Sequence, residues 1–239
     1  MELLPETRAL LGIDVIASAD NPGYHLGALW RALAGMLNQA FADTGIDAEE
    51  VIESEPTGDG ALYTLSSRRL GTLMDFSKRL DELAAEHNRE RKPDVRLRIA
   101  VDLGAVGDVP SYYSAKISRG RLLDAPAFKS ILTRCLAERP DVNSGLILSM
   151  AAFRQVFGGD YTHAVRESEF AEVTVTNKSF REQAWLHVPG FDARSLRELA
   201  AEPNKSEPAA PQVNNQVNGT VNGVQAGTIN GAVSVWGDH

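Results

Sequence analysis

Two carboxylates, Asp14 and Asp59, stand where an acidic side chain could do chemistry. Asp14 interrupts the apolar run of residues 9–17, where an unpaired charge is costly. Asp59 lies in a Gly-Asp-Gly turn, where no bulky neighbour shields it. If that strand and turn are neighbours, both carboxylates face one end of a sheet and, with the Val15 carbonyl, suit Mg²⁺ or Mn²⁺ holding a triphosphate. The alternative is structural: Asp59 favours a turn, and Asp14 is half exposed at a strand end.

The apolar periodicity predicts the elements that position these groups. A central strand is expected at 9–17, a hairpin at 50–65 and an alternating strand at 95–104. Amphipathic helices are expected at 23–44 and 69–88. This β-α-β-β-α-β order predicts an α+β sandwich of ferredoxin-like type, with two long helices against one sheet.

The rest of the chain continues the domain and then changes character. After a loop at 107–120, the expected elements are a helix at 121–138, a strand at 145–149, a short helix at 150–157 and strands at 170–176 and 182–188. Residues 1–200 should therefore form one domain. Residues 201–212 contain three prolines and read as a semi-extended linker, followed by a tail at 213–239.

Composition excludes several classes of protein. The net charge of −8, without a run of Lys or Arg, argues against nucleic acid as a partner. The single cysteine, Cys135, excludes an internal disulfide and a thiolate metal cluster, and a buried thiol is expected. No apolar run reaches the roughly 20 residues of a membrane span, and the N-terminus lacks the basic residues of a signal peptide, so we expect a cytoplasmic protein.

Six segments resemble, in order, the blocks of the class III nucleotidyl cyclase homology domain. They are "LLGIDVIAS", "TGDGALYTL", "VRLRIAVDLGAV", "GRLLDAPAF", "GLILSMAAFRQVF" and "VTVTNKSFREQAWLHVPG". The "RLLDAP" and "AW…PG" sequences are similar to those of a divergent actinobacterial group. The resemblance covers residues 8 to about 190 and implies a fold of nucleotidyl cyclase type, and with it a phosphorus–oxygen lyase that makes a cyclic nucleotide.

The resemblance also implies roles for individual residues. Asp14 and Asp59 would bind two metal ions, with the Val15 carbonyl assisting, while the ribose 3′-hydroxyl attacks the α-phosphate and pyrophosphate leaves. Glu55 lies at the position that selects the purine, where a carboxylate could accept hydrogen bonds from guanine N–H groups. Arg121 would stabilise charge on the α-phosphate.

Two positions depart from the family pattern. Ile117 stands where an asparagine would orient the ribose, and the phosphate-binding lysine falls near Thr176. The neighbouring Lys116 and Arg119 could supply charge but not the geometry of an amide. Lys178 is two residues late, which on a strand would keep the same sheet face. Both an active cyclase and a degenerate nucleotide-binding or scaffold domain stay open. Either should form a head-to-tail homodimer, because the metal ligands and Arg121 would come from different subunits.

The tail sets β-branched residues among Asn, Gln and Gly, with no charge until Asp238. Alone it should be disordered, whereas stacked copies could form amide ladders and interdigitated sheets. Its core, "VNGVQAGTINGAV", resembles RHIM-like bacterial amyloid signalling motifs. The residues expected to carry self-assembly are Val221, Val224, Gln225, Gly227, Ile229 and Gly231.

Together these features suggest a bacterial conflict-system effector in signal transduction. Its cyclase-like domain would act on a nucleoside triphosphate when a receptor-like protein with a matching amyloid motif recruits the tail. The alternatives are a non-catalytic adaptor that signals through the tail, and an ordinary cyclase with a functionless tail.

Overall fold

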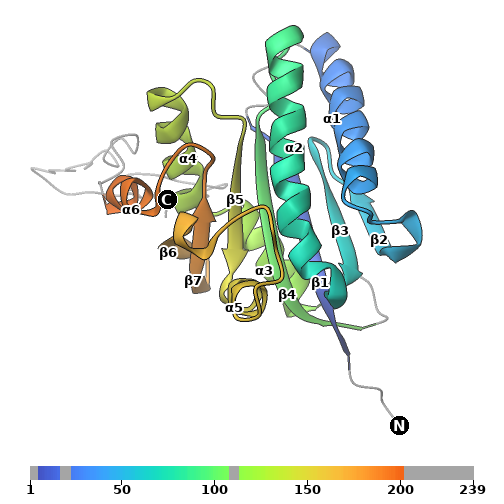
Figure 1. The fold of residues 1–239 in the computed structure, drawn as a ribbon, viewed down its shortest axis with the longest axis vertical. Helices are drawn as coiled ribbons and strands as arrows, with labels where there is room; N and C mark the ends of the chain where they lie inside the picture. Colours follow the sequence, from blue (N-terminus) through green and yellow to red (C-terminus); the bar gives the residue numbers. More distant parts are fainter. Residues whose placement is uncertain (1–4, 17–22, 108–112, 202–239) are drawn as a thin grey trace, which may run out of the picture. The chain divides into compact units, whose positions relative to one another are not determined.

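The computed structural model describes residues 5–16, 23–107 and 113–201 (Figure 1). The linker beyond Ala201 and the whole tail, with its amyloid-like motif, lie outside the described residues. None of the described helices combines the length and the apolarity that a membrane span needs.

The first half of the domain has the predicted β-α-β-β-α-β order. Its strands are β1 (Glu6–Val15), β2 (Val51–Pro56), β3 (Gly60–Ser66) and β4 (Leu97–Val106). Its helices are α1 (Gly23–Asp43) and α2 (Leu70–Glu90). Strand β1 lies between β3 and β4 and is antiparallel to both. The predicted fold class is therefore confirmed.

The described sheet has seven strands in the order β2-β3-β1-β4-β5-β7-β6. Strand β5 (Ser144–Ser149) runs parallel to β4, whereas β6 (Ala171–Asn177) and β7 (Phe180–His187) form an antiparallel hairpin beside it. Between β5 and β6 lies the short helix α5 (Met150–Phe157). Three short 3₁₀ turns also occur among the described residues, at Ala48–Glu50, Ser67–Arg69 and Glu167–Glu169.

Two hydrophobic cores cover opposite faces of the sheet. Helices α1 and α2 lie side by side over one face (Figure 1), where Leu11 and Ile13 pack with Leu33 and Phe76. The other face is covered by α3 (Ser114–Leu123), α4 (Pro126–Glu138) and α6 (Ala193–Ala201), which bury side chains from β4, β5, β6 and β7. Because side chains alternate along a strand, Asp14 points to the face opposite Ile13, the face that α3 covers.

The structure differs from the predicted elements around residue 120. A loop to 120 and one helix at 121–138 were expected, but α3 already begins at Ser114, and α4 is a separate helix that begins at Pro126. The break lies at Ala125, whose backbone is extended (φ −59°, ψ 126°) because the residue before proline avoids the helical region. Helix α6, which buries Leu196 and Leu199, was not predicted from the sequence.

Candidate functional site

Gly60 brings the β2–β3 turn against the end of β1. It pairs with Asp14 in the strand register, and the Val15 amide donates to the Asp59 carbonyl at 2.9 Å. A Cβ atom at position 60 would lie 1.9 Å from the Ile13 carbonyl oxygen, so only glycine fits. The turn that carries Asp59 therefore lies beside the strand end that carries Asp14.

Asp14 is almost fully buried, with 8 % of its surface exposed, and it is paired with Arg98. Arg98 lies opposite Asp14 in the register of β4 and donates from Nε at 2.8 Å and from Nη2 at 2.7 Å, one bond to each carboxylate oxygen. Burial raises the pKa of Asp14 to about 6, although Arg98 lowers it, and the charges of Asp59 and Asp124 raise it further. Two further carboxylates thus act on this strand end besides Asp14.

The oxygen donors here suit a hard divalent cation. Each carboxylate oxygen of Asp14 keeps an acceptor position beyond its bond to Arg98. In the described part of the chain, no group of three or more His, Cys, Asp or Glu side chains could hold a metal ion. A site of two carboxylates and a carbonyl is the kind that Mg²⁺ completes with waters and substrate phosphates.

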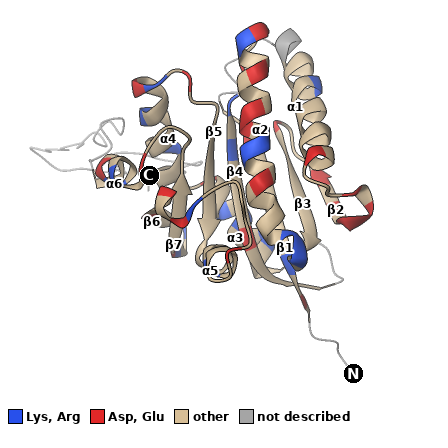
Figure 2. Cartoon of the chain, viewed as in Figure 1, with Lys and Arg blue, Asp and Glu red and all other residues tan. Residues whose placement is uncertain are grey.

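Glu55, the expected purine selector, has a cationic neighbour. The Lys116 Nζ atom lies 3.4 Å from Glu55 Oε1 and also forms a salt bridge with Glu53. Lys116 is only 7 % exposed, although it comes from a stretch expected to be a loop. Its hydrogen bond holds the pKa of Glu53 below the usual range. Acidic residues gather on β2 and on the turn before it (Figure 2), and Lys116 ties this edge to α3.

Arg121, Ile117 and Lys178 come together at a cavity of about 430 Å³ beside α3. Ile117, at the expected asparagine position, is 50 % exposed. Lys178 lies in the turn after β6, with a left-handed φ of 57°, rather than on a strand. The expectation that a shift of two from Thr176 keeps the same sheet face is therefore wrong, because the strand ends at residue 177. Asn177 instead joins this turn to α3 by donating to the Arg121 carbonyl at 3.1 Å.

Within one chain, Asp59 and Arg121 line different cavities. Val15 and Asp59 border an apolar groove of about 350 Å³, together with Leu26, Leu29 and Trp30 of α1. That groove shares no lining residue with the cavity of Arg121 and Lys178.

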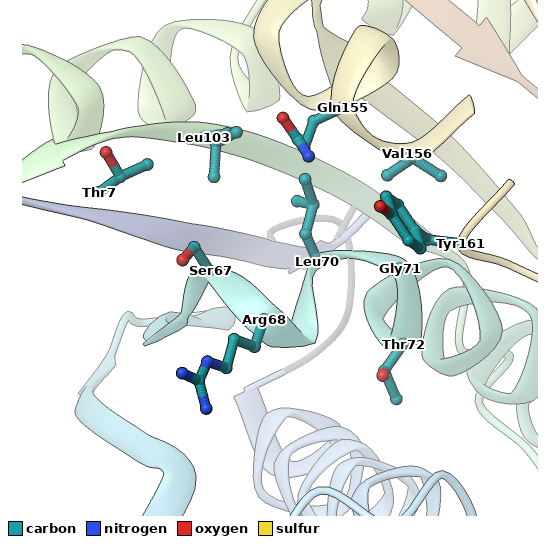
Figure 3. A pocket seen from close by; sticks show the side chains of 10 residues that line it. All are labelled: Thr7, Ser67, Arg68, Leu70, Gly71, Thr72, Leu103, Gln155, Val156 and Tyr161. Carbon is teal, nitrogen blue, oxygen red and sulfur yellow. The ribbon is translucent and has the colours of Figure 1, made fainter. Parts of the chain in front are cut away.

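A further cavity, of about 520 Å³, lies near the start of β1 (Figure 3). Leu103 and Val156 line it, and the single cation of its lining, Arg68, points away from Leu103 (Figure 3). No carboxylate is among its described lining residues. This cavity therefore lacks the ligands that a metal–triphosphate complex needs.

Arg98 was not predicted from the sequence, and Lys116 and Arg119 were expected only to supply positive charge near Ile117. Arg119 is buried on α3 and donates from Nη1 to the Tyr63 carbonyl at 3.3 Å. A Cβ atom on Gly12 would lie 3.4 Å from the Cγ and Cδ atoms of Arg119, so the aliphatic part of this side chain packs on β1 at Gly12. The alternating charges in "RLRI" were the only signal for Arg98, and its partner depends on strand register.

The fold is that of nucleotidyl cyclase catalytic domains. A bacterial light-regulated adenylyl cyclase is 11 % identical, with a TM-score of 0.52 over 83 % of this chain and 97 % of that one. The catalytic core of a rhodopsin-guanylyl cyclase with converted specificity is 12 % identical, with a TM-score of 0.52 over 78 % and 96 %. The guanylate cyclase domain of a Catenaria anguillulae protein is 12 % identical, with a TM-score of 0.50 over 78 % of this chain and 98 % of that one. No protein-family model and no curated sequence matches the chain.

Proposed function

We propose that the chain is a signalling protein whose folded domain converts a nucleoside triphosphate to a cyclic nucleotide and pyrophosphate. The observation that carries this proposal is the convergence of Asp14, Asp59 and Arg98 at one end of β1. Two of the solved cyclase domains with this fold are in complex with ATPαS and with GTP. We extend this class of ligand, the nucleoside triphosphates and their analogues, to the present chain because it has the same fold.

The chemistry divides among a few residues. Asp14, Asp59 and the Val15 carbonyl would hold Mg²⁺ or Mn²⁺, and a bound cation supplies charge neutralisation for the triphosphate and a lower pKa for the ribose 3′-hydroxyl. Arg98 would donate to phosphate oxygens with the N–H groups that Asp14 does not occupy. The 3′-oxygen bonds to the α-phosphorus, the bond from that phosphorus to the bridging oxygen breaks, pyrophosphate leaves, and the hydroxyl proton passes to water.

A head-to-tail homodimer would complete the site. Because Arg121 and Lys178 line a different cavity from Asp59, they would serve the carboxylates of the partner subunit. Arg121 would stabilise charge on the α-phosphate, and Lys178 would bind other phosphate oxygens. Glu55 would contact the base, with Lys116 neutralising part of its charge.

The C-terminal tail would be the input to this domain. We infer that the segment around Val224 and Gln225 stacks on a matching motif of a receptor-like bacterial partner, and that this recruitment controls dimerisation in the cytoplasm. The support is the sequence pattern described above, an uncharged β-branched segment behind a Pro-rich linker.

An assay of the purified full chain tests the enzymatic proposal. With Mn²⁺ and each nucleoside triphosphate, we expect a cyclic nucleotide and an equal amount of pyrophosphate, and more of both when assembled peptide 213–239 is added. Asp59→Asn should remove the product without unfolding the chain, because Asp59 is exposed in a turn. If no condition gives a cyclic product, the domain is not a cyclase.

A second candidate function is that of a nucleotide-binding or dimerising adaptor without turnover. Ile117 favours this candidate, because its side chain cannot make the hydrogen bond of an asparagine. Its half-exposed position should tolerate substitution.

Ile117→Asn distinguishes the two functions. If the domain is an enzyme, we expect turnover to rise by up to about tenfold, since one added hydrogen bond contributes roughly 1 kcal/mol to the transition state. Ile117→Val is the control and should leave turnover unchanged. An adaptor would bind nucleotide equally well in all three forms and give no cyclic product from any of them.

A further inference from the structure

A second groove, of about 940 Å³, lies between α3, the end of β4, α5 and the β6–β7 hairpin. Its lining includes Arg121 of α3, Arg154 of α5 and Arg181 of β7, and we call it the arginine groove. Its volume lies within the range of small-molecule sites. The proposed function leaves Arg154 and Arg181 unused.

The arginines of this groove differ from seven others in the molecule, which are paired with acidic side chains. Ion pairs with acidic side chains occupy Arg8, Arg69, Arg79, Arg96, Arg98, Arg139 and Arg194. Among the described residues, no acidic group forms an ion pair with the guanidinium of Arg121, Arg154 or Arg181. In a chain with a net charge of −8, three such cations around one concavity favour an anionic ligand.

Two acidic residues, Asp102 and Glu182, also line the groove, but they form no ion pair with its three arginines. Asp102 is 4 % exposed, accepts from the Leu103 amide at 2.8 Å, and is also hydrogen bonded by the side chains of Ser149 and Ser118. Its negative charge is therefore held by neutral donors below the surface of the groove. Burial raises the pKa of both Asp102 and Glu182.

The first turn of α5 adds to the positive character of the groove. Ser149, Met150 and Ala151 all border the groove, so the N-terminal end of the helix faces it. The Ser149 hydroxyl oxygen caps the helix by accepting from the Ala152 amide at 3.1 Å. The amide dipoles of a helix favour an anion at this end, in addition to the guanidinium charges.

The groove is distinct from the carboxylate site. Arg98, the partner of Asp14, and Asp102 lie four residues apart on β4, which corresponds to about 13 Å along a strand. The groove shares no lining residue with the one that Asp59 borders. Arg121 and Ile117 also line the cavity of Lys178, whereas Arg154 and Arg181 do not, so these two arginines separate the two functions experimentally.

We propose that the arginine groove binds the phosphate groups of a small polyphosphate, either pyrophosphate or a second nucleoside triphosphate, without a divalent cation. Guanidinium groups present paired N–H donors that match phosphate oxygens. Gln183 and the hydroxyl groups of Ser114 and Ser179 border the same space and add neutral donors. Such a site would let the domain sense either the product or the supply of the proposed reaction.

Calorimetric titration of the full chain in EDTA tests this inference, because the chelator removes the cation that the carboxylate site needs. With pyrophosphate and ATP as separate probes, we expect binding that weakens as salt increases. Arg154→Ser and Arg181→Ser should each weaken binding at least about tenfold, the typical effect of losing a charged hydrogen bond. Arg154→Lys should lose less, since it keeps the charge but not the paired donors.

Two controls separate this site from general effects. Arg89→Ser removes an exposed arginine at the end of α2 and should leave pyrophosphate binding unchanged. Asp14→Asn should abolish cation-dependent nucleotide binding but not the cation-free binding, so failure of the proposed function and failure of this inference are distinguishable. The inference is overturned if no cation-free binding is seen, or if Arg89→Ser and Arg154→Ser lose equal amounts of affinity. It is also overturned if Arg154→Ser changes the oligomeric state, because the groove would then be an interface between copies of the chain.

Discussion

Replacing Arg98 by methionine is expected to lower the free energy of unfolding by about 3–5 kcal/mol at pH 8, the typical effect of breaking a buried ion pair from one side. The side chains of Arg98 and Asp14 are only 13 % and 11 % exposed, so the variant leaves a buried carboxylate without its partner. At pH 5 the loss should be much smaller, because Asp14 can take up a proton instead. Urea unfolding at the two pH values measures the difference.

The loss of stability in Arg98→Met is larger at pH 8 than at pH 5 because of the pKa of Asp14. In the folded wild-type chain this pKa is about 6, above the 3.8 of an unperturbed aspartate, because burial penalises the charged form. The folded state therefore binds the proton more tightly than the unfolded state does. Protonation of Asp14 therefore stabilises the folded state, and this contribution is fully present below pH 3.8 and is lost as the pH rises through 6. Removing Arg98 raises the pKa further, which makes the loss at pH 8 larger.

A double variant is the control for this effect. Asp14→Asn with Arg98→Met removes both charges, and should recover much of the stability that Arg98→Met loses. An equal loss at pH 5 and pH 8 in Arg98→Met would show that the guanidinium acts through packing rather than through the charge of Asp14.

With the exception of α6, the elements whose buried side chains are apolar could be predicted from the sequence. Leu33 and Leu37 of α1, and Leu73 and Leu80 of α2, repeat at helical spacing and are all buried. Helix α3 was missed because two of its buried residues, Lys116 and Arg119, are charged. A hydrophobic pattern cannot reveal a helix that turns cations toward a sheet, since the stabilising carboxylates lie on another strand.

The candidate site was predicted only where the signal is local. Asp14 breaks an apolar strand and Asp59 lies in a glycine-rich turn, and both features are visible without knowing any long-range contact. Arg98 could not be assigned to Asp14, because their contact depends on the register of β1 with β4. The ion pairs of Lys116 could not be predicted for a similar reason, since its carboxylate partners come from the edge strand β2.

Gly60→Ala is the substitution that should affect the site most without changing any of its functional groups. The added methyl would lie 1.9 Å from the Ile13 carbonyl oxygen and 2.8 Å from the Asp14 Cα atom, so the hairpin must move away from β1. We expect a loss of about 3 kcal/mol or more in the free energy of unfolding, at the upper end of the cost of overpacking. We also expect Mn²⁺ affinity, followed by electron paramagnetic resonance, to fall strongly because Asp59 moves away from Asp14.

Gly58→Ala is the matched control in the same turn. A Cβ atom at Gly58 would have no heavy-atom neighbour within 4 Å among those it could meet, so the substitution should change stability by less than about 0.5 kcal/mol. It should also leave Mn²⁺ affinity unchanged, because the contact between the turn and β1 depends on Gly60. If Gly60→Ala binds Mn²⁺ as tightly as Gly58→Ala does, then the approach of the hairpin to β1 is not what assembles the cation site, and Asp59 does not contribute to it.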